Sequence, residues 1–223
     1  MKYITIIALL VSLTNAWYGT GHLLVARIAQ SILEKKDPAT YKQILAILAP
    51  LAKDDASWTK AEGKHPMTEC ATFADDIKFK GGMYQKGWHF IDTPMMDEGG
   101  KISDYNFTAD EHNITEVIGA LSNWFAKGEN YQESYEYKTI MSHTYKIHTE
   151  EEGASTAMRL LIHYVGDIHQ PLHATSRVNH EYPEGDKGGN AFPLPAKDGA
   201  NELHAVWDSV IYEFTGYPKT VSN

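Results

Sequence analysis

The chain has 223 residues, of which 43% are hydrophobic and 22% are charged, a balance that excludes a disordered chain and suits one globular domain. Its formal net charge of -9 excludes binding of nucleic acid through a broad basic face, because such binding depends on Lys and Arg replacing counterions along the phosphates. Eleven histidines in so acidic a chain raise the question of metal binding.

The N-terminal residues have the features of a secretory signal peptide. Lys2 supplies a positive charge, Ile4 to Leu13 form an apolar run, and a small residue, Ala16, follows. The run is too short to span a bilayer, and no later stretch approaches the twenty apolar residues that a spanning helix needs. The sequence therefore predicts a signal peptide at 1–16, a mature domain at 17–223, secretion, and no membrane partner.

Two further features bear on an exported protein. Asn106 and Asn113 each begin a glycosylation sequon, which is compatible with export. Cys70 is the single cysteine, so no disulfide can form within the chain, and we expect it to be a small buried residue.

Apolar residues at helical spacing predict a mainly α fold in one compact domain. Asp37 followed by Pro38 predicts the N-terminus of a second helix, and Thr108 with Glu111 predicts a capping box for a third. The segments 93–105 and 177–195 are rich in Gly, Pro and polar residues and are predicted to be long loops. The predicted helices cover about residues 24–33, 38–51, 109–125, 154–168 and 202–214.

The apolar positions of the last two predicted helices define the faces that we expect to be buried. They are Met158, Leu161, Ile162 and Val165 in one helix, and Leu203, Val206, Val210 and Phe214 in the other.

Histidine and aspartate recur at metal-ligand spacing on these helices. His163 precedes Asp167 by four residues, and His204 precedes Asp208 by four, so each pair shares one helix face. Either pair alone is more often a solvated pair than a site. Here, however, the first lies in an apolar run with His173 nearby, and burying both pairs without a partner would cost several kcal/mol. Neutral imidazole and carboxylate are ligands of a catalytic zinc.

Six further sequence blocks follow one another along the chain: Trp17-Tyr-Gly-Thr-Gly-His22, Phe73-Ala-Asp75, Trp88-His89-Phe90-Ile91-Asp92, His163 to His173, Gly188-Gly-Asn190 and Asn201 to Asp208. Together and in this order they resemble the type I nucleases, the secreted, zinc-dependent nucleases that prefer single strands. The resemblance implies a helical fold shared with the bacterial zinc phospholipases C.

The resemblance implies three zinc ions. One would be held by Asp75, His89 and His163. A second would be held by His22 with the free amino group and carbonyl of Trp17, and Asp167 would bridge the two ions. The third would be held by His173, His204 and Asp208.

The resemblance also implies roles in catalysis and substrate binding. Beside Asp75 and Asp167, it assigns Lys78 to neutralising charge on the phosphate and Asn190 to a hydrogen bond with it. Phe90 would stack on a nucleobase, and Asp92 would accept hydrogen bonds from that base. Three of these residues have a simpler interpretation on their own: Lys78 as a solvated lysine, Asn190 as a turn asparagine and Phe90 as a core phenylalanine.

The resemblance implies that the protein is a secreted, monomeric zinc endonuclease. Its implied substrates are single-stranded DNA or RNA and nucleotides, and its implied products carry 5′-phosphates. Action as a 3′-nucleotidase stays open, as do two alternatives: a phospholipase C-like phosphodiesterase, and a zinc-binding secreted protein with impaired catalysis. Family members carry disulfides and helices beyond the block that ends at Asp208, whereas this chain stops at Asn223. A shortened member and a fragment of a longer protein are therefore both open.

Overall fold

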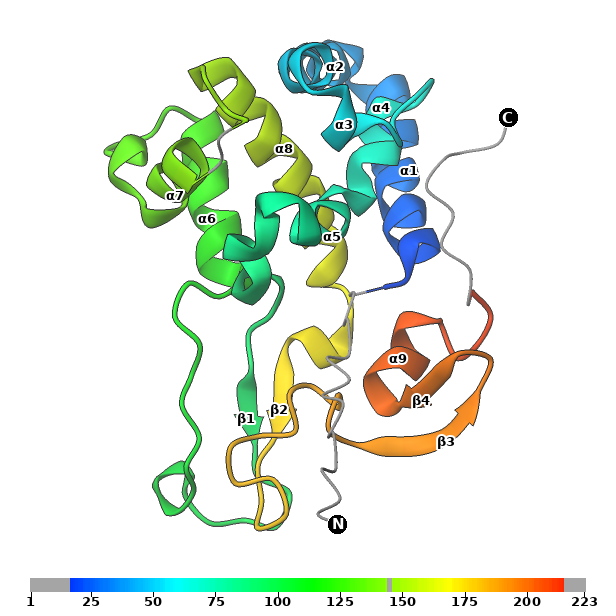
Figure 1. Ribbon diagram of the computed structural model, residues 1–223, viewed down its shortest axis with the longest axis vertical. Coiled ribbons are helices and arrows are strands. Elements are labelled where there is room, and N and C mark those ends of the chain that lie inside the picture. Colours follow the sequence, from blue (N-terminus) through cyan, green and yellow to red (C-terminus); the bar gives the residue numbers. More distant parts are fainter. Residues whose placement is uncertain (1–16, 144–145, 215–223) are drawn as a thin grey trace, which may run out of the picture.

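A computed structural model describes residues 17–143 and 146–214 of the chain, and the fold is mainly helical, as predicted (Figure 1). The predicted signal peptide lies outside the described residues. The α-helices are α1 (Gly19–Lys36), α2 (Pro38–Asp54), α3 (Ala56–Thr59), α4 (Pro66–Glu69), α5 (Phe73–Ile77), α6 (Ile114–Phe125), α7 (Tyr135–His143), α8 (Glu150–Asp167) and α9 (Leu203–Asp208). Shorter helical turns are η1 (Cys70–Thr72), η2 (Lys78–Gly82), η3 (Met83–His89), η4 (Ile102–Asp104), η5 (Tyr131–Glu133) and η6 (Pro171–His173).

Capping side chains decide where two of the predicted helices begin. The Asp37 carboxylate accepts a hydrogen bond from the Thr40 N–H at 3.1 Å, and Pro38 opens α2, so this prediction is confirmed. For α6 the predicted capping box at Thr108 was wrong. The Asn113 side chain instead accepts hydrogen bonds from the first backbone N–H groups, and the helix starts at Ile114.

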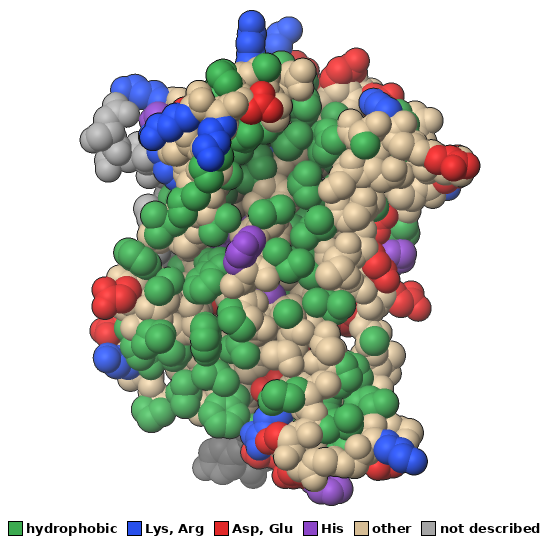
Figure 2. All heavy atoms as spheres, turned by 180° about the vertical axis from the view of Figure 1, so that it is seen from behind, with side chains coloured by type: hydrophobic (Ala, Val, Ile, Leu, Met, Phe, Trp, Pro, Cys, Tyr) green, Lys and Arg blue, Asp and Glu red, His purple; other side chains and the backbone are tan. Residues whose placement is uncertain are grey.

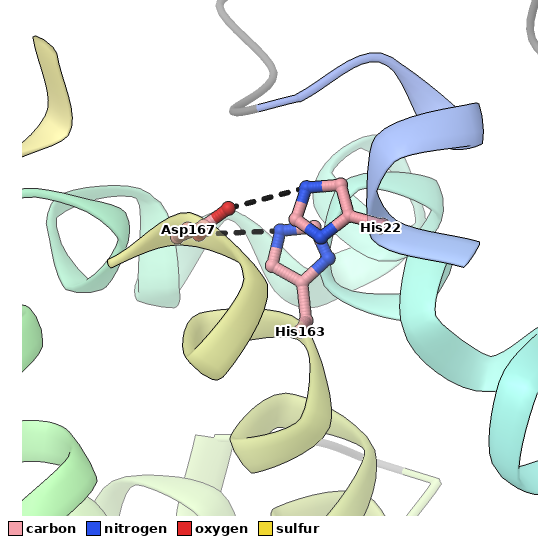
Figure 3. A group of neighbouring side chains, drawn as sticks. All are labelled: His22, His163 and Asp167. Carbon is pink, nitrogen blue, oxygen red and sulfur yellow. Dashed lines mark ion pairs between the residues drawn. The ribbon is translucent and has the colours of Figure 1, made fainter. Parts of the chain in front are cut away.

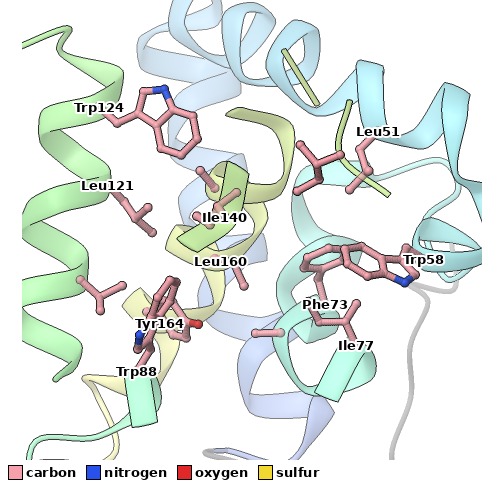
Figure 4. Close-up of a cluster of buried hydrophobic side chains, with 14 of the residues drawn as sticks. Leu51, Trp58, Phe73, Ile77, Trp88, Leu121, Trp124, Ile140, Leu160 and Tyr164 are labelled. Carbon is pink, nitrogen blue, oxygen red and sulfur yellow. The ribbon is translucent and has the colours of Figure 1, made fainter. Parts of the chain in front are cut away.

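Helix α8 runs through the centre of the molecule and packs against α1, α2, α5, α6 and α7. Its side chains Leu160 and Tyr164 lie between Leu121 and Trp124 of α6 on one side and Phe73 of α5 on the other (Figure 4). All five are at most 3% exposed, so this core fixes the position of α8 and of the residues at its C-terminal end.

Four short strands lie in segments for which the sequence predicted no strand. They form two separate two-stranded sheets: β1 (Thr93–Met95) pairs in parallel with β2 (Thr175–Arg177), and β3 (Pro193–Lys197) pairs antiparallel with β4 (Ala200–Glu202). The first pair follows η3 and η6 in the chain, so it brings the ends of those two turns together.

Two predicted apolar faces differ from the structure. Val165 and Phe214 are exposed rather than buried, and the last predicted helix ends at Asp208, after which Val210 to Tyr212 have positive φ. On α1, Leu24, Ile28 and Ile32 are likewise exposed. Figure 2 shows hydrophobic side chains gathered on the rear side of the molecule. No helix within the described residues is both long and apolar enough to cross a membrane.

Candidate metal centre

The first group of candidate ligands joins the two longest helices. His22 comes from α1, and His163 and Asp167 come from the last turn and a half of α8 (Figure 3). The His22 and His163 rings stack with centroids 3.9 Å apart. Asp167 Oδ1 lies 3.2 Å from His22 Nε2, and Asp167 Oδ2 lies 3.3 Å from His163 Nε2. The i, i+4 spacing on α8 thus puts both of its residues beside His22, as predicted.

A second group shares His163 and adds Asp75 and His89. Asp75 Oδ1 lies 3.8 Å from His163 Nε2, and His89 Nδ1 lies 3.2 Å from the same nitrogen. His89 Nδ1 is also 2.7 Å from Asp167 Oδ2. Asp167 therefore contacts histidines of both groups, which is the placement expected of a bridging carboxylate.

The third group contains His173, His204 and Asp208, all at most 2% exposed. His173 Nε2 and His204 Nε2 are 3.1 Å apart, and His204 Nε2 lies 3.6 Å from Asp208 Oδ1. Phe90 packs on the His173 ring with centroids 4.3 Å apart. The predicted histidine and aspartate ligands thus assemble into three groups.

Backbone carbonyls fix the tautomers of three histidines. His163 Nδ1 lies 2.6 Å from Ala71 O, His173 Nδ1 lies 2.7 Å from His89 O, and His204 Nδ1 lies 2.7 Å from Gly188 O. A carbonyl oxygen can only accept, so each Nδ1 carries hydrogen, and in the neutral ring Nε2 keeps a lone pair. In neutral His173 and His204, the two lone pairs face each other at 3.1 Å.

Burial keeps most of these imidazoles neutral. Desolvation lowers the pKa of His89 to about 4, of His173 to about 3 and of His204 to about 4. His163 differs: burial lowers its pKa, but Asp167 and Asp75 outweigh that effect and raise it. Neutral imidazole is the form that binds a metal.

The pKa values of Asp167 at the end of α8 and Asp208 at the end of α9 shift in opposite directions. Burial raises the pKa of Asp167, but His163 and His89 outweigh this and hold it well below its usual value. Burial raises the pKa of Asp208 well above its usual value, opposed only in part by a hydrogen bond from Gln170. A cation in the third group would stabilise the ionised form of Asp208.

The residues present fit a divalent cation. Both ring nitrogens of His22 and Asp167 Oδ1 are buried, and no hydrogen bond to another described residue satisfies them. Converging lone pairs and unsatisfied buried acceptors are costly in a protein interior. A cation removes this cost, and the mixed imidazole and carboxylate donor set suits zinc.

Trp17 lies beside the first group. Its indole N–H donates to Gly166 O at 3.1 Å, one residue before Asp167. Gly21 and Gly166 permit this close packing because neither has a Cβ. An added Cβ on Gly21 would meet Trp17 Cβ at 2.4 Å, and one on Gly166 would meet His22 Nδ1 at 2.6 Å. The assignment of the Trp17 amino group as a ligand stays a prediction.

The predicted substrate residues surround these groups. Lys78 Nζ lies 2.8 Å from Asp75 Oδ1 and is 8% exposed. Phe90 and Asp92 are half-buried, and burial with the nearby charges of Asp110 and Asp186 raises the pKa of Asp92 to about 6. Asn190 Nδ2 donates to Lys187 O at 2.7 Å, so one amide hydrogen of Asn190 is already committed.

Sequence reasoning missed two buried glutamines. Gln85 Oε1 lies 2.7 Å from His89 Nε2, and Gln170 Nε2 donates to Asp208 Oδ1 at 2.8 Å. Both glutamines are 0% exposed. Gln170 lies inside the block from His163 to His173, so the resemblance could have marked it as a residue of the site. Gln85 lies in none of the six blocks, and no signal in the sequence marks it.

A mainly helical domain with three largely buried groups of histidine and aspartate has the arrangement found in the class of metal-dependent enzymes. The sequence model of the S1/P1 Nuclease family matches residues 17–220, and the chain therefore belongs to this family.

Curated relatives agree with this assignment. The chain is 28% identical over 219 residues to "Endonuclease 3" of Arabidopsis thaliana, covering 95% of this chain and 60% of the relative. It is 26% identical over 201 residues to "Nuclease S1" of Aspergillus oryzae, covering 90% and 56%. The chain thus spans somewhat more than half the length of these relatives.

Proposed function

We propose that the protein is a zinc-dependent endonuclease that hydrolyses phosphodiester bonds of single-stranded DNA and RNA and leaves 5′-phosphate products. The observation that carries this proposal is the convergence of ligand lone pairs and carboxylates in three adjoining buried groups, in a chain of the S1/P1 nuclease family. Names of the relatives support nucleic acid as the substrate.

The three groups would hold three zinc ions, with Asp167 shared between the first two. Bound zinc supplies Lewis-acid polarisation of the phosphate and a nucleophilic water near neutral pH. The protein holds the ligands in place before the ions bind, since the core fixes α8 and backbone carbonyls fix three histidine tautomers. Such preorganisation lowers the cost of reaching the reactive geometry.

We propose that Lys78 binds the phosphate. Its ammonium group lies 2.8 Å from Asp75 and is largely shielded from water, so its charge acts over a short distance in a medium of low dielectric constant. We assign it to neutralising negative charge that develops on phosphorus oxygens, with the free amide hydrogen of Asn190 as a second donor.

Phe90 and Asp92 would select unpaired bases. The Phe90 ring packs on His173 and remains partly exposed, so a base could stack on it, and such stacking contributes about 1–3 kcal/mol per base. Only an unstacked base can use this surface, which favours single strands. Asp92 is the stronger acceptor of hydrogen bonds from the base when it is ionised, so base binding should strengthen above about pH 6.

Export is part of the proposal. Removal of the predicted leader would free the amino group of Trp17. The Trp17 indole already donates a hydrogen bond to the carbonyl of Gly166, the residue before Asp167. A free amine binds metal only when unprotonated, so cleavage would complete the first group. Asn106 is exposed and suits glycosylation, whereas the Asn113 side chain caps α6.

The test combines metal content with substrate choice. Elemental analysis of the secreted protein should find three zinc ions per chain. The same preparation should cleave a single-stranded oligonucleotide faster than its duplex, and Phe90→Ala should raise KM for the single strand while zinc content stays unchanged. A zinc-loaded protein that releases phosphocholine from lipid and no nucleotides would refute the proposal. Release of phosphate from 3′-nucleotides would establish nucleotidase activity as well.

A further inference from the structure

His89 differs from the other histidines of the centre in what holds its ring. Backbone carbonyls accept from Nδ1 of His163, His173 and His204. The His89 ring instead has a side-chain partner, since its Nε2 lies 2.7 Å from Gln85 Oε1. Its Nδ1 faces the second group of ligands, 3.2 Å from His163 Nε2. Metal binding by His89 therefore requires hydrogen on Nε2 and a lone pair on Nδ1.

The surroundings of Gln85 determine which end of its amide faces His89. Gln85 Nε2 donates to Ala74 O at 2.8 Å, and the reversed amide would place two oxygens in contact there. Gln85 Oε1 also accepts the Tyr164 hydroxyl at 2.6 Å. Gln85 and Tyr164 are both 0% exposed, so water does not compete, and Gln85 Oε1 stays an acceptor toward His89.

A competing acceptor lies on the other side of the ring. Asp167 Oδ2 is 2.7 Å from His89 Nδ1, and a carboxylate is a stronger acceptor than an amide. Without Gln85, hydrogen on Nδ1 would bond to Asp167, and both His89 and Asp167 would lose a ligand atom. A neutral imidazole carries only one N–H, so the two acceptors compete for it.

We propose that Gln85, supported by Tyr164, is a positioning residue that holds His89 in the Nε2–H tautomer and keeps Nδ1 free for metal. The proposal rests on the proposed zinc binding at the group of Asp75, His89 and His163. An amide achieves this without adding a negative charge to a centre that already contains Asp75 and Asp167.

Gln85→Met removes the acceptor with little change in side-chain length. Partners that orient a metal-bound histidine change metal affinity by about 10- to 100-fold when they are lost, so zinc binding at the His89 group should weaken by that factor. Gln85→Glu loses the donor to Ala74 O and should be less stable, but it keeps an acceptor toward His89 and should retain the Nε2–H tautomer. Gln170→Met is the matched control, because Gln170 contacts Asp208 of the third group instead.

Nitrogen NMR of protein labelled at histidine gives a readout independent of activity. At one fixed pH, ring shifts identify which nitrogen carries hydrogen, and zinc titration of each variant follows the His89 and His173 rings separately. We expect Nε2–H on His89 in the zinc-loaded wild-type protein, weaker zinc binding at His89 in Gln85→Met, and weaker binding at His173 in Gln170→Met.

The wild-type spectrum alone can overturn the proposal, even if Gln85→Met does not fold. Zinc bound with His89 carrying hydrogen on Nδ1 would refute it, and so would unchanged zinc affinity and tautomer in Gln85→Met. If the wild-type protein bound no zinc at any group, the proposed function itself would fail.

Discussion

Adding one methyl group at Gly166 should weaken metal binding while leaving the protein able to fold. It lies in the last turn of α8 between His163 and Asp167, and an added Cβ would stand 2.6 Å from His22 Nδ1, where ordinary contact begins at 3.4 Å. In Gly166→Ala the His22 ring must therefore move. Zinc–ligand distances tolerate about 0.2 Å, which is much less than this displacement.

Two effects on stability oppose each other in this variant. Replacing a helical Gly by Ala stabilises by up to ~1 kcal/mol, whereas overpacking a buried site costs about 1–3 kcal/mol. The zinc-free protein should consequently change little in stability or lose about 1–2 kcal/mol. Zinc affinity at the His22 group should fall at least about tenfold, which corresponds to ~1.4 kcal/mol.

Gly119→Ala on α6 is the matched control. An added Cβ there meets nothing within 4 Å, so this variant should gain up to ~1 kcal/mol and bind zinc normally. Urea unfolding of zinc-free protein measures the first quantity, and competition with a chelator measures the second. If Gly166→Ala bound zinc like Gly119→Ala and gained as much stability, the inferred contact between Gly166 and His22 would be wrong.

Two further predictions concern buried charge. Burial, with Asp110 and Asp186, raises the pKa of Asp92 to about 6, so ionisation of Asp92 destabilises the folded state as the pH rises from about 4 to 6. Asp92→Asn should stabilise zinc-free protein by about 2 kcal/mol at pH 7.5 and lose most of that gain at pH 4, and equal urea midpoint shifts at both pH values would contradict this. Arg159 is 0% exposed and contacts both Glu62 oxygens at 2.6 Å, so Arg159→Met should cost about 3–5 kcal/mol by leaving a buried carboxylate alone. Adding Glu62→Leu to Arg159→Met should recover part of that loss, and a double variant less stable than Arg159→Met would refute this account.

Local sequence signals predicted the helices best where a cap and a repeat agreed. At Asp37, the capping side chain and the following proline define the start of α2, and the structure agrees. At Thr108 the same reasoning failed, because Asn113 offers an equivalent cap closer to the apolar repeat of α6. The repeat Leu24, Ile28 and Ile32 marks a helix, but it does not show which face the rest of the chain covers.

The two His/Asp pairs illustrate the same limit at the functional site. Spacing of four residues places His163 with Asp167 and His204 with Asp208, and the structure confirms both neighbourhoods. Spacing does not show that Asp167 also contacts His89, a residue 78 positions away. That contact depends on how α8 packs against the segment that ends in η3.

The sequence by itself determined the type of ligands, the helical class and membership of the S1/P1 nuclease family, because these depend on residue identity and short-range spacing. Tertiary structure alone decided the tautomers of His163, His173 and His204, the shared position of Asp167, and the contacts of Gln85. These depend on the direction of hydrogen bonds between residues far apart in the chain, and such directions are fixed only when the core packs.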